Sequence, residues 1–292
     1  MTYFRHFAAI DWSGAVGEWQ RGIAVAICAR GTAAPHLVRA DQRWSRTTVL
    51  DWLLHDMPDD TLVGLDLGPS LPFADRGAFF PEWDRSPPDA RGLWALVDEL
   101  CAQDAHLAAS SFVDHPDAAS HFRRHGNRKG DLYGTGGGRL RETERAQREQ
   151  GLNPYSNLNL VGAAQVGKSS LTGMRVLNRA QHRLPIWPFD ARPSYGSLIV
   201  EIYTSIAALA AGRTKGRTKM TSIAALNDAL VSPTIASEPV TMLDRVDDHR
   251  TDALLTSAWL RAVADQQTLW SPLALQDNRR LAQTEGWTFG CI

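Results

Sequence analysis

Residues 4–12, FRHFAAIDW, decide the fold, because a mostly apolar run of strand length ends there at an acidic residue, Asp11. The segment TLVGLDL at 61–67 has the same pattern and ends at Asp66. A third apolar run, SLIVEIYTS at 197–205, carries an acidic residue in its interior. Short apolar runs of this kind are typical of strands that are buried on both faces. We therefore predict an α/β protein with a mixed sheet.

The remaining segments supply further strands and the helices around the sheet. Residues 21–29 and 35–40 are predicted to form a hairpin pair of strands, and 157–161 a short strand. Apolar residues at helical spacing predict helices over 47–57, 89–102, 169–182, 220–231 and 248–264. Residues 111–157 are rich in glycine and arginine, and we predict a loop-rich insertion there. The whole chain, 1–292, is expected to form a single domain.

The composition excludes several classes of protein. Charged residues make up 22% of the chain and hydrophobic residues 43%, which is typical of a globular protein and not of a disordered chain, collagen or a coiled coil. No apolar run approaches the ~18 residues of a membrane span, and no secretory signal pattern is present. The three cysteines are far apart and are predicted to be reduced thiols. These features predict a cytoplasmic protein with no membrane contact.

The charge is balanced overall but unevenly distributed. The chain has 31 Lys plus Arg against 32 Asp plus Glu. Residues 121–150, however, carry eight basic residues against four acidic ones, and residues 212–219 carry four basic residues and no acidic one. Arginine side chains suit phosphate oxygens, so these stretches are candidates for a local nucleic-acid surface. The alternative is that they are ordinary solvated loops.

Five acidic residues call for a common explanation. Asp11, Asp66 and Glu201 lie in or at the ends of predicted buried strands, where a carboxylate costs several kcal/mol unless it is paired or bound to metal. Asp248 and Asp252 are four residues apart at the start of the 248–264 helix, in line with its apolar stripe, so both face inward. Asp248 also fits the N-cap of this helix.

Carboxylate oxygens converging on one cleft predict a site for Mg²⁺ or Mn²⁺. Two such ions can position water and stabilise the leaving oxygen when a phosphodiester is hydrolysed. We predict that Asp11, Asp66, Glu201 and Asp252 are the catalytic residues and metal ligands, with Asp248 as an additional ligand.

The order of these motifs resembles the domain of unknown function 429 family, described as predicted ribonuclease-H-like nucleases. The resemblance is carried by FAAIDWSGA (7–15), LVGLDLGPSLPF (62–73), VEIYTS (200–205) and DDHRTDALLTSAWLRA (247–262). It extends to SFVDHPDAASHFRRHG (111–126), RLRETERAQ (139–147), NLVGAAQVGKSSLTGM (159–174) and WPFD (187–190), as in longer members of that family.

The resemblance implies a ribonuclease-H-like core: a five-stranded mixed sheet, with the first three strands antiparallel, flanked by helices. It places Asp11 on the central strand, Asp66 and Glu201 on the fourth and fifth strands, and Asp252 on the helix that closes the site. The implied function is divalent-metal-dependent nuclease activity on DNA or RNA. Ser13, Lys168 and Ser169 are candidate contacts for a substrate phosphate.

Three alternatives remain open. Gly162–Ser169 fits the pattern GxxxxGK[ST] of a phosphate-binding loop, which would make the chain a nucleotide-binding protein or NTPase. AIDWSG at 9–14 loosely resembles the first phosphate loop of actin-like phosphotransferases, but no second copy of it occurs. The third alternative is a catalytically inactive ribonuclease-H-like binding module.

Overall fold

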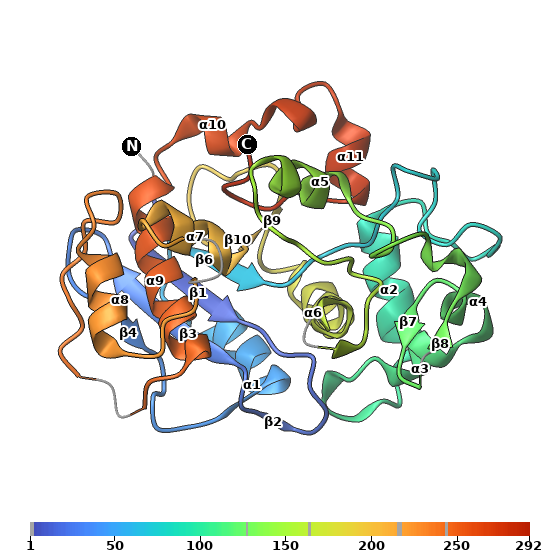
Figure 1. Ribbon diagram of the computed structural model, residues 1–292, viewed down its shortest axis with the longest axis horizontal. Helices are drawn as coiled ribbons and strands as arrows, with labels where there is room; N and C mark the ends of the chain where they lie inside the picture. Colours follow the sequence, from blue (N-terminus) through green and yellow to red (C-terminus); the bar gives the residue numbers. More distant parts are fainter. Residues whose placement is uncertain (1–2, 127, 163–164, 215–217, 243–244) are drawn as a thin grey trace.

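A mixed six-stranded sheet lies at the centre of the protein in the computed structural model, which describes all residues except 1–2, 127, 163–164, 215–217 and 243–244 (Figure 1). The strands lie in the order β4-β3-β1-β6-β10-β9. Their bounds are β1 His6–Asp11, β3 Ala24–Ala29, β4 His36–Leu37, β6 Thr61–Asp66, β9 Ile186–Trp187 and β10 Leu198–Glu201. Two further pairs lie outside this sheet: β2 (Trp19–Gln20) with β5 (Trp44–Ser45), and β7 (Arg123–Arg124) with β8 (Arg128–Lys129).

Strand direction changes at β1. Strand β3 is antiparallel to both of its neighbours, β1 and β4, whereas β6 runs parallel to β1, β10 parallel to β6, and β9 parallel to β10. The predicted mixed sheet is therefore confirmed, and so is the antiparallel arrangement of its first three strands. The predicted number of five strands is wrong, because the two-residue strand β9 adds a sixth at the edge. The predicted strand over 157–161 is also absent from the sheet, since that segment forms only an isolated bridge between Asn159 and Arg123.

Helices cover both faces of the sheet. On one face, Phe7, Ala9 and Val200 belong to a core that includes helices α7, α8 and α9, and Figure 1 shows these helices in orange and red over the strands. On the other face, Ala8 and Ile10 belong to a core shared with α2 and α6. Successive side chains of a strand point to opposite faces, so each buried strand needs apolar residues at nearly every position.

The predicted helices are found with small shifts at their ends. The helix predicted over 47–57 is divided into α1 (Arg46–Asp51) and the π-helical turn η1 (Trp52–Asp56). The others are α2 (Ala90–Leu100), α6 (Val166–Ala180), α8 (Ile223–Leu230) and α9 (Asp248–Val263). The sequence did not predict α7 (Thr204–Ala210), α10 (Gln267–Trp270) or α11 (Arg279–Thr284), or the short turns η2 (Ala105–Leu107) and η5 (Leu273–Leu275). The 197–205 run was predicted as one strand, but β10 ends at Glu201 and α7 begins at Thr204.

The segment 111–157 is more regular than the predicted loop-rich insertion. It contains the hairpin β7–β8 and most or all of α3 (Ser110–Asp114), α4 (Pro116–Ala119), η3 (Asp131–Tyr133) and α5 (Glu142–Glu149). Phe112, Phe122 and Tyr133 from this segment are buried in the core beside α2 and α6. The segment is thus packed into the protein.

None of the described helices combines the length and the apolar character that crossing a bilayer requires. All three cysteines are buried and unpaired, as the sequence predicts.

Candidate functional site

Three of the predicted acidic residues lie on one face of the sheet. Asp11 and Asp66 are register partners at the ends of the parallel neighbours β1 and β6. Alternation along each strand places their side chains on the face covered by α9, the same face as Phe7 and Leu62. Helix α9 packs across β1, β3 and β6, and it carries Asp252 in its second turn. The sequence prediction that these three residues come together is consistent with this arrangement.

The charges of these three carboxyl groups act on one another. Burial raises the pKa of Asp66 well above its usual range, and the nearby charges of Asp11 and Asp252 raise it further. Burial together with the charges of Asp11 and Asp248 raises the pKa of Asp252 to about 8. Burial also raises the pKa of Asp11. Carboxyl groups that raise one another's pKa in this way form a site at which added positive charge is stabilising.

His249 is bound to Asp11. Its Nδ1 lies 3.0 Å from Asp11 Oδ2, and this contact, opposed by partial burial, raises the pKa of His249 to about 9. The imidazole is therefore protonated at neutral pH and donates to the carboxylate. Gly22 gives the ring room, because a Cβ at this position would lie 3.2 Å from His249 Cε1. His249 was not among the sequence-predicted site residues, although its spacing of three residues from Asp252 is a signal that both share a face.

Asp248 lies at the edge of this group and is already paired. The Nζ atom of Lys219 is 2.5 Å from Asp248 Oδ2, and this bond lowers the pKa of Asp248. Asp248 is not the N-cap of α9, because the cap is Asp247, whose Oδ1 accepts the backbone N–H of Arg250. Lys219 comes from the second basic stretch, so at least one cation of that stretch lies beside the acidic group.

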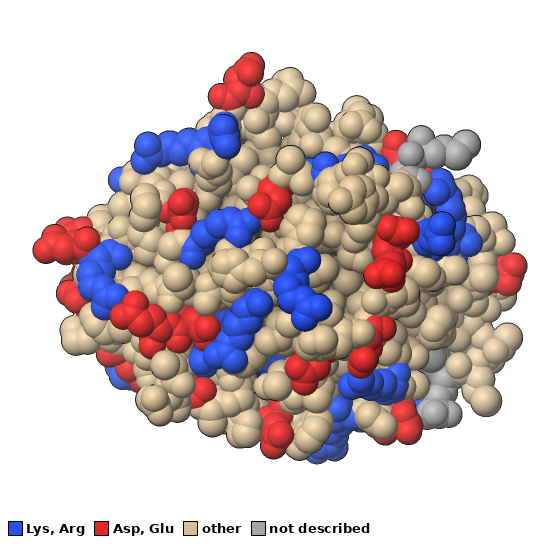
Figure 2. Space-filling view, turned by 180° about the vertical axis from the view of Figure 1, so that it is seen from behind, with Lys and Arg blue, Asp and Glu red and all other residues tan. Residues whose placement is uncertain are grey.

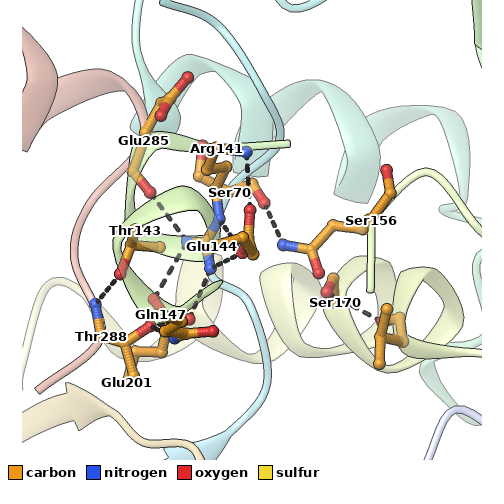
Figure 3. Close-up of polar contacts among 12 residues, drawn as sticks. Ser70, Arg141, Thr143, Glu144, Gln147, Ser156, Ser170, Glu201, Glu285 and Thr288 are labelled. Atoms are coloured by element: carbon orange, nitrogen blue, oxygen red, sulfur yellow. Dashed lines mark hydrogen bonds and ion pairs between the residues drawn. The ribbon is translucent and has the colours of Figure 1, made fainter. Parts of the chain in front are cut away.

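Glu201 lies near Asp66 and lines the same cavity, but its carboxylate is already paired. Its side chain is held by the buried guanidinium of Arg141, whose Nη1 and Nη2 lie 3.0 Å and 2.5 Å from the two carboxylate oxygens. Thr288 Oγ1 also donates to Glu201 at 2.9 Å. Arg141 contacts Glu144 as well, so one cation lies between two buried carboxylates (Figure 3). Glu201 is therefore part of an ion-pair network.

Strand β10 is buried on both faces of the sheet and ends at Glu201. Leu198 and Val200 belong to the core beside α9, whereas Ile199 belongs to the core on the opposite face. Glu201 has the same parity as Ile199, yet at the end of β10 it lines the same cavity as Asp66. A strand buried on both faces has no alternating polarity, and the sequence could not show which face Glu201 occupies.

A cavity of about 550 Å³ opens beside the acidic group. Asp66 and His249 line it on one side, and the turn after β1, including Ser13, forms part of its wall. The buried guanidinium of Arg46 holds this turn by donating to the carbonyl oxygens of Ser13 and Ala15. Arg46 was not a sequence candidate, because nothing in its local pattern indicates this role.

Lys168 and Ser169 lie at the start of α6, next to the turn that contains Ser13. A Cβ on Gly14 would lie 2.4 Å from the carbonyl carbon of Lys168, so the two backbone segments are in direct contact. Ser169 lines the cavity, whereas Lys168 Nζ lies 3.0 Å from His125 Nε2 and is not part of the lining.

The phosphate-loop pattern at Gly162–Ser169 is not preceded by the strand that such a loop normally follows. Such a loop connects a strand of a parallel sheet to a helix, but residues 157–161 form no strand of the sheet. Two positions of the pattern, 163–164, lie outside the described residues. The helix α6 begins at Val166, in agreement with the second half of the pattern.

The donor chemistry of the acidic group fits a hard divalent cation, which takes oxygen ligands. Within the described part of the chain, no set of three or more His, Cys, Asp and Glu side chains is grouped so that it could hold a metal ion. Mg²⁺ commonly uses only one or two protein carboxylates and completes its shell with water and substrate phosphate. Asp11 and Asp66, as register partners, are the pair that matches this requirement.

Positive charge near the site is local. On the face seen in Figure 2, basic and acidic side chains are interspersed. Near α6, in contrast, the hairpin β7–β8 presents exposed Arg123, Arg128 and Lys129, and His125 of its turn contacts Lys168.

No family model, curated protein or solved structure matches this chain.

Proposed function

We propose that the protein is a divalent-metal-dependent nuclease that hydrolyses phosphodiester bonds of DNA or RNA. The observation that carries the proposal is the placement of Asp11, Asp66 and Asp252 on one face, next to a cavity, with raised pKa values. Keeping three carboxyl groups together without a bound cation is unfavourable, which is typical of sites that serve function at the expense of stability.

We propose further that the sheet is a ribonuclease-H-like core, as the sequence resemblance implies. The antiparallel strands β1, β3 and β4 and the parallel strands β6 and β10 support this assignment, with β9 as an addition at the edge. Membership of the domain of unknown function 429 family, which the sequence resemblance implies, is part of the same proposal.

The ligand set differs from the one predicted from the sequence. Asp11 and Asp66 would hold Mg²⁺ or Mn²⁺, with Asp252 completing the group, whereas Glu201 is occupied by Arg141 and Asp248 by Lys219. When bound, a divalent cation lowers the pKa of nearby water and offsets charge on the phosphate.

The residues of the chain have separate tasks in this proposal. Asp252, with a pKa of about 8, is suited to accept a proton from the attacking water near neutral pH. Protonated His249 lines the cavity and can donate a hydrogen bond to a phosphate oxygen or a proton to the leaving oxygen. Ser13 and Ser169 offer hydroxyl groups from the cavity wall.

The test compares wild type with Asp11→Asn, Asp66→Asn and Asp252→Asn, using Asp228→Asn on the exposed side of α8 as the control. We expect Mn²⁺-dependent cleavage of labelled oligonucleotides by the wild type and the control, and a loss of about 100-fold or more in the other variants. Calorimetry should show that Asp11→Asn also loses Mn²⁺ binding, while circular dichroism shows that it stays folded.

Two results would reject the proposal. One is cleavage by Asp11→Asn at the wild-type rate. The other is a wild type that shows neither Mn²⁺-dependent cleavage nor a Mn²⁺-dependent shift in thermal unfolding, which is the behaviour of an inactive binding module.

A further inference from the structure

The cavity beside Asp66 has the size of a binding site for one small ligand. Its volume of about 550 Å³ lies within the ~300–1,000 Å³ of typical ligand pockets. One wall is the turn after β1, and another is the segment that includes Tyr155 and Asn157. A nucleic-acid duplex is too wide to enter such a space, since its major groove alone is ~12 Å across. A single nucleotide that is not base-paired can enter it.

Two tyrosines line this cavity at different depths. Tyr155 is 51% exposed and is one of eight exposed large hydrophobic residues in the described part of the chain. Tyr203 is more deeply placed, and burial raises the pKa of its hydroxyl, with smaller contributions from Asp66 and Tyr155. These three side chains therefore lie in one region. Aromatic rings beside a phosphodiester-cleaving site are typical surfaces for stacking unpaired bases.

Amide side chains provide polar contacts in the same cavity. Gln147 donates through its Nε2 to Thr288 Oγ1 at 2.8 Å, and Asn157 donates through its Nδ2 to the carbonyl oxygen of Ser70 at 3.0 Å. Both residues line the cavity. Each of these amides uses one N–H in the bond described, so its second N–H and its carbonyl oxygen are the groups that can bond to the edge of a base.

Positively charged side chains lie outside the cavity, where the rest of a bound nucleic-acid strand would run. The hairpin β7–β8 presents exposed Arg123, Arg128 and Lys129, and its turn contacts Lys168 at the start of α6. The next residue of that helix, Ser169, lines the cavity. A phosphate next to a nucleotide in the cavity, on the side of Ser169, can thus approach the positive charge of the hairpin.

We propose that the cavity receives one unpaired nucleotide of a single-stranded nucleic acid, with Tyr155 as the surface on which its base stacks. This inference rests on the proposed nuclease function and adds the form of the substrate.

The test measures binding without cleavage. Fluorescence anisotropy in EDTA, repeated in Ca²⁺, compares a labelled single-stranded oligonucleotide, the same sequence as a blunt duplex, and an abasic strand of equal length. We expect the single strand to bind at least about tenfold more tightly than the duplex. Tyr155→Ala should weaken single-strand binding about 5- to 100-fold, as expected for the loss of one stacking contact. Tyr155→Phe should bind within about twofold of wild type, since it keeps the ring.

The control is Tyr195→Ala, which removes a tyrosine that is 81% exposed and is not part of the cavity lining. It should leave affinity unchanged, and the abasic strand should bind wild type and Tyr155→Ala equally. Equal affinity for duplex and single strand, an unchanged affinity of Tyr155→Ala, or no binding in either buffer would overturn the inference. If the protein cleaves nucleic acid but gives any of these binding results, only this inference is rejected. If binding depends on Tyr155 but no Mn²⁺-dependent cleavage occurs, the nuclease proposal is rejected and the single-strand site is kept.

Discussion

His249 Nδ1 lies 3.0 Å from Asp11 Oδ2, joining the start of α9 to the end of β1. The two residues are 238 positions apart in the chain, so the pair exists only in the folded protein. It holds a positive charge against a buried carboxyl group, and this contact opposes the rise in the pKa of Asp11 that burial causes.

The first prediction concerns the pH dependence of this pair. The pKa of His249 is raised to about 9 in the folded protein, against 6.5 for the free side chain. Its stabilisation is therefore fully present below pH 6.5 and is lost as the pH rises through about 9. In EDTA, His249→Gln should be less stable than wild type at pH 6, by at most about 1 kcal/mol because the His249 side chain is 41% exposed. Urea unfolding should show that the difference disappears near pH 10. A difference that grows with pH would contradict the assignment.

The second prediction separates two acidic residues of one helix. The carboxyl group of Asp252 has a pKa of about 8 in the folded protein against 3.8 when free, so the stability of the wild type falls as the pH rises from 4 to 8. Asp252→Asn should therefore stabilise the metal-free protein by about 1–2 kcal/mol at pH 8 and by little at pH 4.

The matched control is Asp248→Asn. Lys219 lowers the pKa of Asp248, so this carboxylate contributes stability above its free pKa and loses it in acid. The variant should be slightly less stable than wild type at pH 8, by under about 1 kcal/mol for this partly exposed pair. If thermal unfolding showed the same sign for both variants at pH 8, the charge assignment would be wrong.

The sequence predicted the strands and helices of the site better than it predicted which side chains pair with one another. The apolar runs that end at Asp11 and Asp66 predicted two strands correctly, and helical spacing predicted α9 with Asp252 facing inward. The sequence could not show which face of the sheet Glu201 occupies. In a strand that is buried on both faces, a shift of one residue moves a side chain to the opposite face without changing the apolar pattern. The partner of Glu201, Arg141, lies 60 residues earlier, in a segment whose glycine and arginine content suggested loops. Such a long-range pair leaves no local pattern.

The third prediction concerns Arg141. Removing this cation would leave the carboxylates of Glu144 and Glu201 buried without a positively charged partner, so Arg141→Met should lower the free energy of unfolding by ~3–5 kcal/mol. Arg145→Met is the control, because its ion pair with Glu142 is exposed and should contribute less than about 1 kcal/mol. Urea unfolding of both variants measures the difference. Similar values for the two would show that Arg141 does not stabilise the buried carboxylates.

The fourth prediction concerns Lys168 and the nucleotide-hydrolase alternative. If Lys168 acts with the hairpin on a nucleic-acid backbone, Lys168→Ala should weaken oligonucleotide binding and reduce the salt dependence of log K by about one unit. Lys168→Arg keeps the charge and should retain most of the affinity. Wild type should not bind ATP in calorimetry. ATP binding that Lys168→Ala abolishes would instead favour the phosphate-loop alternative.

The last prediction tests the contact between the turn after β1 and the start of α6. A Cβ on Gly14 would lie 2.4 Å from the Lys168 carbonyl carbon and 2.5 Å from the Ser169 backbone nitrogen, and backbone atoms cannot move away cheaply. Gly14→Ala should therefore lower the free energy of unfolding by ~1–3 kcal/mol.

The same substitution should disturb the site more than it disturbs the rest of the protein. The turn itself carries Ser13 in the cavity wall and is bonded to Arg46, so a shift forced at Gly14 displaces part of that wall. Single-strand affinity in EDTA should fall with Gly14→Ala even at temperatures where the variant is fully folded. Gly137→Ala is the control, since the nearest atom to its added methyl group would be Arg148 Nη2 at 3.9 Å. Equal stability and equal affinity of the two variants would mean that this contact does not position the cavity wall.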